Sequence, residues 1–372
     1  MHLTHITLNH LDHDRRLKNQ AHSAVSAKYQ VLIIALGRAG ELKEENALFG
    51  DVRRIFSPFV HGGPLKFIHY NLHLFFLLWH IRTDILHAHD LWVLPAAALI
   101  AAFKKRKLVY DAHEYYAGLM IFKKRPVRKL VWLFMESLLV KYIDALLTVS
   151  EPLAEKYRQR YPNISDYRVI RNLPFREQPS LKQAMSFPRP FKHMLVYHGH
   201  LKPGRGLENL IRAMAHVENT GLVIIGGGEL LERIRRLVCE LDVSEKVIIN
   251  DYVSLESIIS TSAQADIGVV LFEKTSTNYS YALPNKFFEY IMAGLPVLTS
   301  DIETLSGYVQ KYDLGRTVDP SDPRLIGKTI LEMTGDPEAL QKWRKNAHKA
   351  SEDLNWDREA EKLLKIYEKL AD

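Results

Sequence analysis

Apolar residues along this chain gather in short runs that alternate with longer amphipathic stretches. Residues 3–8 and 30–36 have the pattern of buried strands, and residues 17–27 between them have the spacing of a helix. The same rhythm of strand, helix and strand returns along most of the chain. It predicts an α/β protein whose parallel sheets are covered by helices on both faces.

The remaining runs extend this pattern into two halves. Further strands are predicted at 84–90, 108–114, 146–150, 169–174, 194–199, 221–225, 247–253, 265–272 and 296–300. Between the halves, residues 175–190 are rich in proline and have little periodicity, which is typical of a linker. We therefore expect a first domain at 1–174, a linker at 175–190, a second domain at 191–352 and a C-terminal helical segment at 353–372.

One stretch combines a turn, a helix start and a carboxylate. Pro284 and Asn285 form the predicted turn, the helix follows at 286–292, and Glu289 lies about one turn into it. A helix start offers unpaired N–H groups and a positive dipole end, so it suits an anion such as a diphosphate. The carboxylate of Glu289 suits the vicinal hydroxyls of a ribose instead. The stretch therefore predicts a site for a nucleoside diphosphate.

The string PNKFFEYIMAGLPV at 284–297 resembles the donor-binding signature of the retaining glycosyltransferases of family 4. A buried helix alone would account for its Phe, Ile and Met residues, but not for Asn285, Lys286 and Glu289. The resemblance implies the GT-B fold, in which two Rossmann-like, doubly wound parallel-sheet domains face each other across a cleft. It also implies that the C-terminal helix crosses back to the first domain.

The loop HGHLKPGRG at 198–206 continues this resemblance. Gly199 and Gly206 let the backbone approach a ligand closely. Family members usually carry two cations here: Arg205 matches the second, whereas His200 stands where the first is expected and Lys202 is an alternative. The resemblance implies that the donor diphosphate is held by Arg205, by Lys286 and by the helix start near Pro284.

Two further parts of the donor site are implied by the family. The nucleobase would lie against the backbone after the strand at 247–253, which indicates Tyr252 and Val253. The family's fuller motif begins with a Glu eight positions before Glu289, but here that position is Tyr281. The donor sugar would then be contacted by other groups in this stretch, namely Asn278, Ser280, Tyr281 or the backbone at Ala282 and Leu283.

The string YDAHE at 110–114 ends another predicted strand and carries His113. The resemblance implies that His113 lies against the donor sugar, where it binds a hydroxyl or positions the reacting centre. The alternative is an ordinary loop histidine. In the preceding strand His87 is expected to be structural, and His89 and Asp90 are candidates for the acceptor side.

The loop after the first strand faces the ligand crevice in folds of this class. Many family members have glycines there, whereas this chain has polar and charged residues, among them Asp12, His13 and Arg15. These three residues are candidates for contacts with an acceptor. The alternative is a solvated loop at the entry of a helix.

Composition narrows the cellular setting. Of 372 residues, 47 % are hydrophobic, which is enough for sizeable cores. Cys239 is the single cysteine, so an intrachain disulfide is excluded and a reducing compartment fits. The pattern of a signal peptide is missing at the N-terminus, and the most apolar segments are interrupted by polar residues. We therefore expect a cytoplasmic protein.

Charge is uneven along the chain. Residues 1–175 contain 25 basic and 15 acidic residues, whereas the remainder contains 25 and 28. Basic clusters lie at 104–107 and at 123–129, and the second leads into the aromatic and aliphatic segment 131–140. This pattern fits peripheral contact with an anionic membrane surface. The alternative is a solvated loop with a packed helix. No nucleic-acid-binding module is recognisable, so a nucleic acid partner is not expected.

The resemblance implies a metal-independent, cofactor-free hexosyltransferase. It would move a sugar from a UDP- or GDP-sugar to a glycan or lipid-linked acceptor, with retention at the anomeric carbon, in the assembly of cell-surface polysaccharide or glycolipid. Two alternatives remain at this point. One is a GT-B nucleotide-sugar epimerase or phosphorylase, and the other is a non-catalytic, transferase-like scaffold on a membrane.

Overall fold

The structure is a computed structural model that describes residues 1–59, 63–119, 125–176, 184–275 and 277–371. The side chains of His13 and Thr277 are also outside the described part. The chain divides into two compact units. Unit 1 contains Met1–Asn172 and Arg358–Asp372, and unit 2 contains Leu173–Asp357.

Unit 1 is built on an eight-stranded sheet with the order β3-β4-β2-β1-β5-β6-β7-β8. All neighbouring strands are parallel except β3 and β4, which form an antiparallel pair. The strands are β1 (His2–Ile6), β2 (Gln30–Leu36), β3 (Glu44–Ala47), β4 (Gly50–Ile55), β5 (Ile85–His89), β6 (Lys107–Ala112), β7 (Ala145–Thr148) and β8 (Tyr167–Val169).

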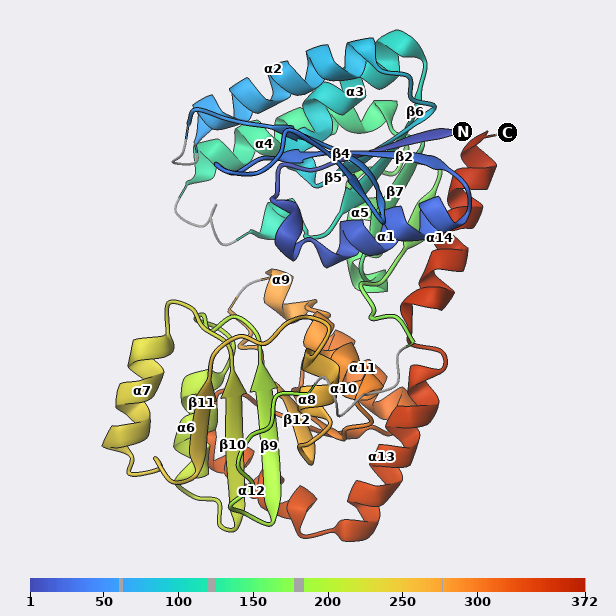
Figure 1. The fold of residues 1–372 in the computed structure, drawn as a ribbon. Coiled ribbons are helices and arrows are strands. Elements are labelled where there is room, and N and C mark those ends of the chain that lie inside the picture. Colours follow the sequence, from blue (N-terminus) through green and yellow to red (C-terminus); the bar gives the residue numbers. More distant parts are fainter. Residues whose placement is uncertain (60–62, 120–124, 177–183, 276, 372) are drawn as a thin grey trace. The chain divides into compact units, whose positions relative to one another are not determined.

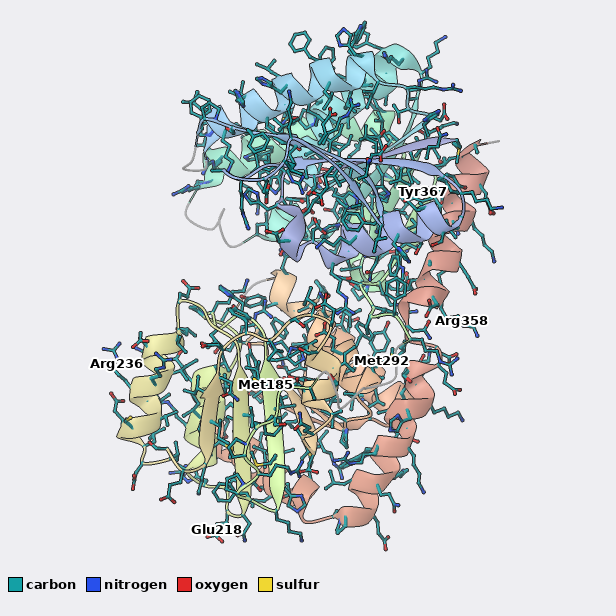
Figure 2. The ribbon with its side chains drawn as sticks, viewed as in Figure 1. Met185, Glu218, Arg236, Met292, Arg358 and Tyr367 are labelled. Atoms are coloured by element: carbon teal, nitrogen blue, oxygen red, sulfur yellow. The ribbon has the colours of Figure 1, made fainter. Side chains whose placement is uncertain are left out.

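Helices cover both faces of this sheet (Figure 1). One face carries α2 (Pro64–His80), α3 (Leu94–Lys104) and α4 (Pro126–Leu139), and α5 (Glu151–Arg160) follows β7. The other face carries α1 (Arg15–Ser26) and α14 (Trp356–Ala371), the last helix of the chain. Within unit 1, Glu359 of α14 forms an ion pair with Arg171 at 2.5 Å. Tyr367 of α14 lies fully buried against the sheet (Figure 2).

Unit 2 has a six-stranded sheet with the order β11-β10-β9-β12-β13-β14, and every neighbouring pair is parallel. The strands are β9 (His193–His198), β10 (Thr220–Ile225), β11 (Val247–Asn250), β12 (Ile267–Val270), β13 (Val297–Ser300) and β14 (Gly315–Val318). The helices are α6 (Leu207–Met214), α7 (Leu231–Glu240), α8 (Ile258–Ser262), α9 (Thr277–Ser280), α10 (Asn285–Met292), α11 (Glu303–Tyr312), α12 (Pro323–Thr334) and α13 (Pro337–Ser351).

The predicted fold class of two α/β units with parallel, doubly wound sheets is confirmed. The strand predicted at 169–174 is wrong in position, because β8 ends at Val169. Its partner β7 ends at Thr148, so the ladder has no further residues to pair with. The hairpin of β3 and β4 was not predicted, since β3 has the polar sequence EENA and lies at the sheet edge.

Part of the predicted linker, residues 177–183, lies outside the described residues. On either side of that gap the chain packs on unit 2. Leu173 and Phe187 are buried in its core, and the N–H of Met185 donates to Thr261 Oγ1 at 3.0 Å.

No helix within the described ranges combines the length and the apolar content that crossing a bilayer requires.

Candidate functional site

The strand order of unit 2 creates a natural ligand position at one edge of its sheet. From β9 the chain adds β10 and β11 on one side, and then returns to add β12, β13 and β14 on the other. In open parallel sheets, ligands bind outside the carboxyl ends of the strands where this order reverses. In unit 2 that point lies between the ends of β9 and β12.

The loop that follows β9 needs glycine because the backbone is crowded there. Gly199 has φ +115°, a conformation that other residues rarely adopt. Gly226, after the neighbouring β10, has φ +143°, and a Cβ atom there would lie 2.1 Å from the carbonyl oxygen of Gly199. The turns after β9 and β10 therefore pack with backbone directly against backbone. We call these two turns, at Gly199 and Gly226, the glycine floor of the site.

Helix α10 begins beside this floor. Pro284 precedes it in an extended conformation, and among the described residues no side chain caps its first N–H groups. The Lys286 side chain is only 6 % exposed, and its Nζ lies 3.5 Å from the ring centre of Tyr197. A Cβ atom on Gly199 would lie 3.5 Å from the same nitrogen. Burial lowers the pKa of Lys286 well below its ordinary value, and Arg205 lowers it further. A buried amine of this kind favours an anionic ligand.

Glu289 lies one turn further along α10 and is 5 % exposed. Its Oε2 lies 3.5 Å from Nε2 of His198, the last residue of β9. The N–H of His198 in turn donates to the Tyr290 hydroxyl at 3.0 Å. The carboxylate is thus held at the end of the central strand, next to the glycine floor.

Arg205 supplies a second cation at this edge. Its guanidinium lies over the rings of Phe272 and Tyr279, with centroid distances of 4.5 and 5.8 Å. Its Nε is buried and has no hydrogen-bond partner among the described residues. The charge of Arg205 also lowers the pKa of Lys286.

The other predicted donor residues lie around this centre. His200 Nδ1 lies 2.9 Å from the Tyr252 hydroxyl, which donates to the carbonyl oxygen of Gly227 at 2.6 Å. His200 is therefore occupied with Tyr252 and does not stand free as the expected first cation. Lys202 is half-buried in the same loop, and Gly206, with φ +62°, precedes α6.

The segment before α10 surrounds the helix start. The carbonyl oxygen of Ala282 accepts from Thr304 Oγ1 at 2.7 Å, so this segment is anchored to α11. Tyr281, Leu283 and Asn285 lie beside it in sequence, and Val253 packs on the core of unit 2.

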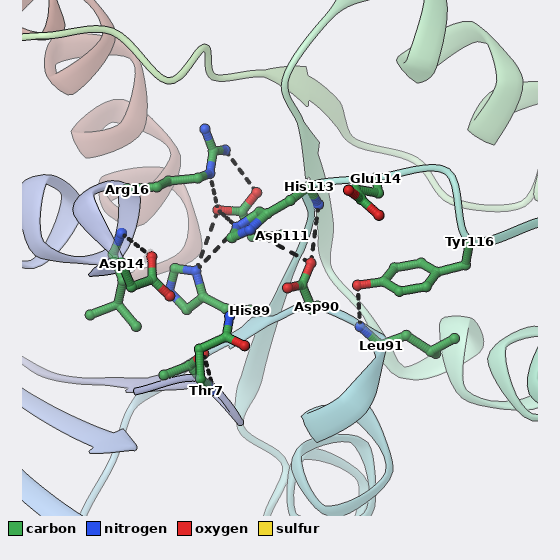
Figure 3. A network of polar contacts seen from close by, with 12 residues as sticks. Thr7, Asp14, Arg16, His89, Asp90, Leu91, Asp111, His113, Glu114 and Tyr116 are labelled. Carbon is green, nitrogen blue, oxygen red and sulfur yellow. Dashed lines mark hydrogen bonds and ion pairs between the residues drawn. The ribbon is translucent and has the colours of Figure 1, made fainter. Parts of the chain in front are cut away.

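Unit 1 carries a second polar cluster, at the carboxyl ends of β5 and β6 (Figure 3). Its centre is Asp111, which is fully buried. Arg16 of α1 donates to both carboxylate oxygens of Asp111, at 2.7 and 2.8 Å, and also to the carbonyl oxygen of Ile170 at 2.6 Å. Gln20 adds a hydrogen bond of 2.8 Å to Asp111. Burial alone would raise the pKa of Asp111. Arg16 and His113 outweigh burial and hold this pKa well below its usual range.

His113 lies between two carboxylates. Its Nε2 is 3.4 Å from Asp111 Oδ2, and its Nδ1 is 3.6 Å from Asp90 Oδ1. Burial disfavours the charged ring, but Asp90 and Asp111 outweigh burial and raise the pKa of His113 to about 9. The ring is therefore an imidazolium at neutral pH. The side chain is 20 % exposed, so it can offer a hydrogen-bond donor or a positive charge to a ligand. Because the ring is already protonated, it is not suited to act as a base.

Beneath His113 lies a stack of three fully buried imidazoles, His5, His87 and His89. The rings of His87 and His89 are 4.5 Å apart and nearly parallel, at 6°. His5 Nδ1 lies 2.9 Å from His89 Nε2, and the Tyr367 hydroxyl lies 2.7 Å from His87 Nδ1. Burial lowers the pKa of all three rings and so favours their neutral form. His87 is structural, as predicted.

The residues predicted to contact an acceptor differ in burial and in their partners. Because His89 is buried, it supports His113 from below, and its assignment as an acceptor contact does not fit. Asp90 is only partly buried, and its Oδ1 accepts from the backbone N–H of His113 at 3.4 Å. Asp12 pairs with Arg38 at 2.7 Å in an exposed position. Arg15 is half-buried at the start of α1, and the His13 side chain lies outside the described part.

Within the described part of the chain, two groups of side chains each bring three metal-ligand atoms within 4.8 Å of one another: His5, His87 and His89, and His89, Asp111 and His113. In the first group, His5 Nδ1 and His89 Nε2 face each other at 2.9 Å and His87 Nδ1 faces the Tyr367 hydroxyl at 2.7 Å, so these nitrogens already have hydrogen-bond partners. In the second group, Arg16 already neutralises the carboxylate. Neither arrangement fits a bound cation well.

Asp12 and Asp14 form an Asp-x-Asp sequence, but the two carboxylates have different partners. Asp12 pairs with Arg38, while Asp14 accepts the N–H of Leu17 as the N-cap of α1.

Comparison with known proteins agrees with this architecture. The family model described as glycosyltransferase family 4 matches residues 14–173, and the model described as glycosyl transferases group 1 matches residues 185–350. The two matches together cover most of both units. Among curated proteins, an uncharacterized glycosyltransferase of Methanocaldococcus jannaschii is 24 % identical over 301 residues, which are 77 % of this chain and 75 % of that protein.

Solved structures show the same fold. Sucrose-phosphate synthase from Thermosynechococcus elongatus superposes with a TM-score of 0.78 at 17 % identity, covering 100 % of this chain and 99 % of that one. HepE from Anabaena, solved in complex with UDP-glucose, gives a TM-score of 0.72 at 13 % identity, covering 99 % of this chain and 100 % of that one. The chain is a glycosyltransferase that belongs to family 4 and has the GT-B fold.

Proposed function

We propose that this glycosyltransferase moves a sugar from a UDP- or GDP-sugar to a glycan or lipid-linked acceptor, with retention at the anomeric carbon. The observation that carries the proposal is the buried pair of Lys286 and Glu289 at the switch point of unit 2. The amine lies against the glycine floor, and the carboxylate faces the end of β9. One group suits a diphosphate and the other a ribose, and together they match a nucleoside diphosphate. HepE, a protein of the same fold, has been solved with UDP-glucose.

The residues of unit 2 would stabilise the leaving group. As the bond between the anomeric carbon and the diphosphate oxygen breaks, negative charge grows on the nucleoside diphosphate. Lys286, Arg205 and the first N–H groups of α10 are preorganised to receive it, without a metal ion. The acceptor oxygen bonds to the anomeric carbon, and its proton passes to the departing diphosphate oxygen. His113 would contribute its positive charge and a donor to a sugar hydroxyl.

The stereochemistry of transfer tests this function. We expect the chain to consume a UDP- or GDP-sugar in the presence of an acceptor and to give a product with the donor's anomeric configuration, as read by proton NMR. An inverted product would contradict the proposal. An epimerised donor without any acceptor would favour an epimerase, release of a sugar phosphate would favour a phosphorylase, and an inert donor would favour a scaffold.

We further propose that unit 1 touches an anionic membrane, as expected in the assembly of glycolipid or cell-surface polysaccharide at the cytoplasmic face. Helices α2 and α4 both expose large apolar side chains at helical spacing. On α2 these are Leu65, Ile68, Leu72, Phe76 and Trp79, and on α4 they are Val127, Leu130, Val131, Phe134 and Leu138. Basic residues lie beside them at Arg125, Arg128 and Lys129. An exposed apolar face with basic residues matches an interfacial surface. Lys123 and Lys124 of the predicted cluster lie outside the described residues.

Vesicle binding measures this contact. We expect the chain to co-sediment with phosphatidylserine vesicles at low salt and to be released as salt rises. Neutralising Arg125, Arg128 and Lys129 to Gln should weaken binding by about a hundredfold, since each basic residue near such a surface contributes about 1 kcal/mol.

A matched control neutralises three exposed lysines of unit 2, Lys328, Lys345 and Lys349. It should bind vesicles like the unaltered chain. Absence of binding at low salt, or equal losses in both triple variants, would contradict membrane contact through α4.

A further inference from the structure

A groove of 960 Å³ lies between α2 and α4 in unit 1. Its walls are apolar and include Phe67, Ile68, Trp92, Val131, Trp132 and Met135. The volume is at the upper end of the range for small-ligand sites, about 300–1,000 Å³. The groove can therefore take a hydrocarbon chain.

Aromatic rings give this groove a fixed wall. The Trp132 ring packs edge-on against the rings of Phe67 and Trp92. The distances between ring centroids are 4.7 Å to Phe67 and 4.6 Å to Trp92. Trp92 and Trp132 pack against the core of unit 1 while part of each ring stays accessible. The wall is thus held in place before any ligand arrives, which reduces the entropy lost on binding.

The rim of the groove is basic. Lys66, Arg125 and Arg128 line it, and the described residues that line it include no acidic side chain. Neither arginine makes an ion pair within the described ranges of the chain. An apolar groove with unpaired cations at its rim is complementary to an anionic amphiphile, because guanidinium groups bind phosphate through paired hydrogen bonds.

The groove also reaches the edge of the sheet that carries the polar cluster. Leu8, which lines it, follows directly after β1, and Trp92 comes two residues after Asp90 at the end of β5. Asp90 contacts His113. A ligand whose chain lies between α2 and α4 would therefore place its head group near the residues assigned to the acceptor side.

We propose that this groove binds a single-chain lipid phosphate. The chain lies against Trp132 and Met135, and the phosphate is held by Arg125 and Arg128. If the chain has the proposed transferase function, the acceptor is a lipid phosphate, or a glycan carried on one. Its head group extends toward His113. The exposed apolar side chains of α2 and α4 continue the groove outward, so a lipid can enter it from a bilayer.

Calorimetric titration tests the groove without any donor. Decyl phosphate, kept monomeric below its micelle concentration, is the probe, and decanol and inorganic phosphate are the comparison ligands. We expect decyl phosphate to bind at least about tenfold more tightly than either, because only it engages both the groove and the rim. Val131→Trp, at an exposed wall position, should block the chain and reduce affinity at least about tenfold.

The charge variant Arg125→Glu with Arg128→Glu should lose decyl phosphate binding. Its matched control, Lys43→Glu with Lys141→Glu, makes the same charge change at two exposed lysines of unit 1 that do not line the groove, and should bind normally. Each variant's melting temperature verifies that it is folded.

Several results would overturn the proposal: no binding of decyl phosphate, equal binding of decanol, unchanged affinity in Val131→Trp, or equal losses in both charge variants. Binding to anionic vesicles without binding of decyl phosphate would assign the face to the bilayer surface alone. Decyl phosphate binding in a chain that consumes no nucleotide sugar would uphold the groove while refuting the transferase proposal, so the two failures are distinguishable.

Discussion

Replacing Lys286 with methionine is expected to reduce kcat of sugar transfer by about a hundredfold to a thousandfold, the usual cost of losing one charge-stabilising group. The protein should remain folded and its melting temperature should not fall. The Lys286 amine is buried over the Tyr197 ring, and burying a polar or charged group without a partner is unfavourable for folding. Methionine keeps the apolar stem and removes that amine. The measurement is initial rates at saturating donor, together with thermal unfolding.

Lys311→Met is the matched control. Lys311 also lies near a tyrosine ring, that of Tyr312 at 5.1 Å, but on α11 at the surface. It should leave kcat unchanged. If Lys286→Met retained full kcat, Lys286 would not stabilise the leaving group.

Replacing Asp111 with alanine is expected to destabilise unit 1 by about 3–5 kcal/mol. The substitution leaves the Arg16 guanidinium, 3 % exposed, without its carboxylate partner, and it also removes an acceptor facing Gln20 and His113. Urea unfolding followed by tryptophan fluorescence measures the loss. Because Asp111 supports His113, transfer should also fall in any folded fraction.

Asp12→Ala provides the comparison. Asp12 also pairs with an arginine, Arg38 at 2.7 Å, but both side chains are about half exposed, at 54 % and 45 %. Surface pairs contribute about 1 kcal/mol or less. If Asp111→Ala cost no more than Asp12→Ala, the buried pair would not be an anchor of unit 1.

The turn and the helix of the candidate donor site could be predicted from sequence because both are local. The turn at Pro284, the start of α10 and Glu289 lie within six residues, and the dipole and spacing of a short helix follow from sequence alone. Gly199 was also visible as a signal. Its close fit against Gly226 was not, since this depends on the register of β9 beside β10.

The polar cluster of unit 1 was only partly predictable. Asp111 and His113 appeared at the end of a predicted strand, but Arg16 is 95 positions away and Tyr367 is 280 positions from His87. Such pairings follow from how helices lie on the sheet, which local pattern does not specify. A signal did exist for the imidazole stack, because His87 and His89 alternate along one strand and so face the same side.

The environment of His200 could not be predicted from sequence. Its position matched that of a phosphate-binding cation, yet the fold brings Tyr252 within 2.9 Å of its ring. Tyr252 follows a different strand, β11, so the contact required the tertiary structure. Arg205 and Lys286 remain the two cations predicted for the donor diphosphate.

The central claim is that Glu289 holds the ribose of a nucleoside diphosphate at the start of α10. The most direct measurement is calorimetric titration of UDP and GDP, and of the 2′,3′-dideoxy form of whichever binds more tightly, into the unaltered chain and into Glu289→Gln. We predict that the unaltered chain loses about tenfold to a hundredfold in affinity when the hydroxyls are removed, as expected for hydrogen bonds to a charged group. Glu289→Gln should bind weakly and hardly distinguish the two forms. Equal affinity of the unaltered chain for both forms, or no binding of either nucleotide, would contradict the account.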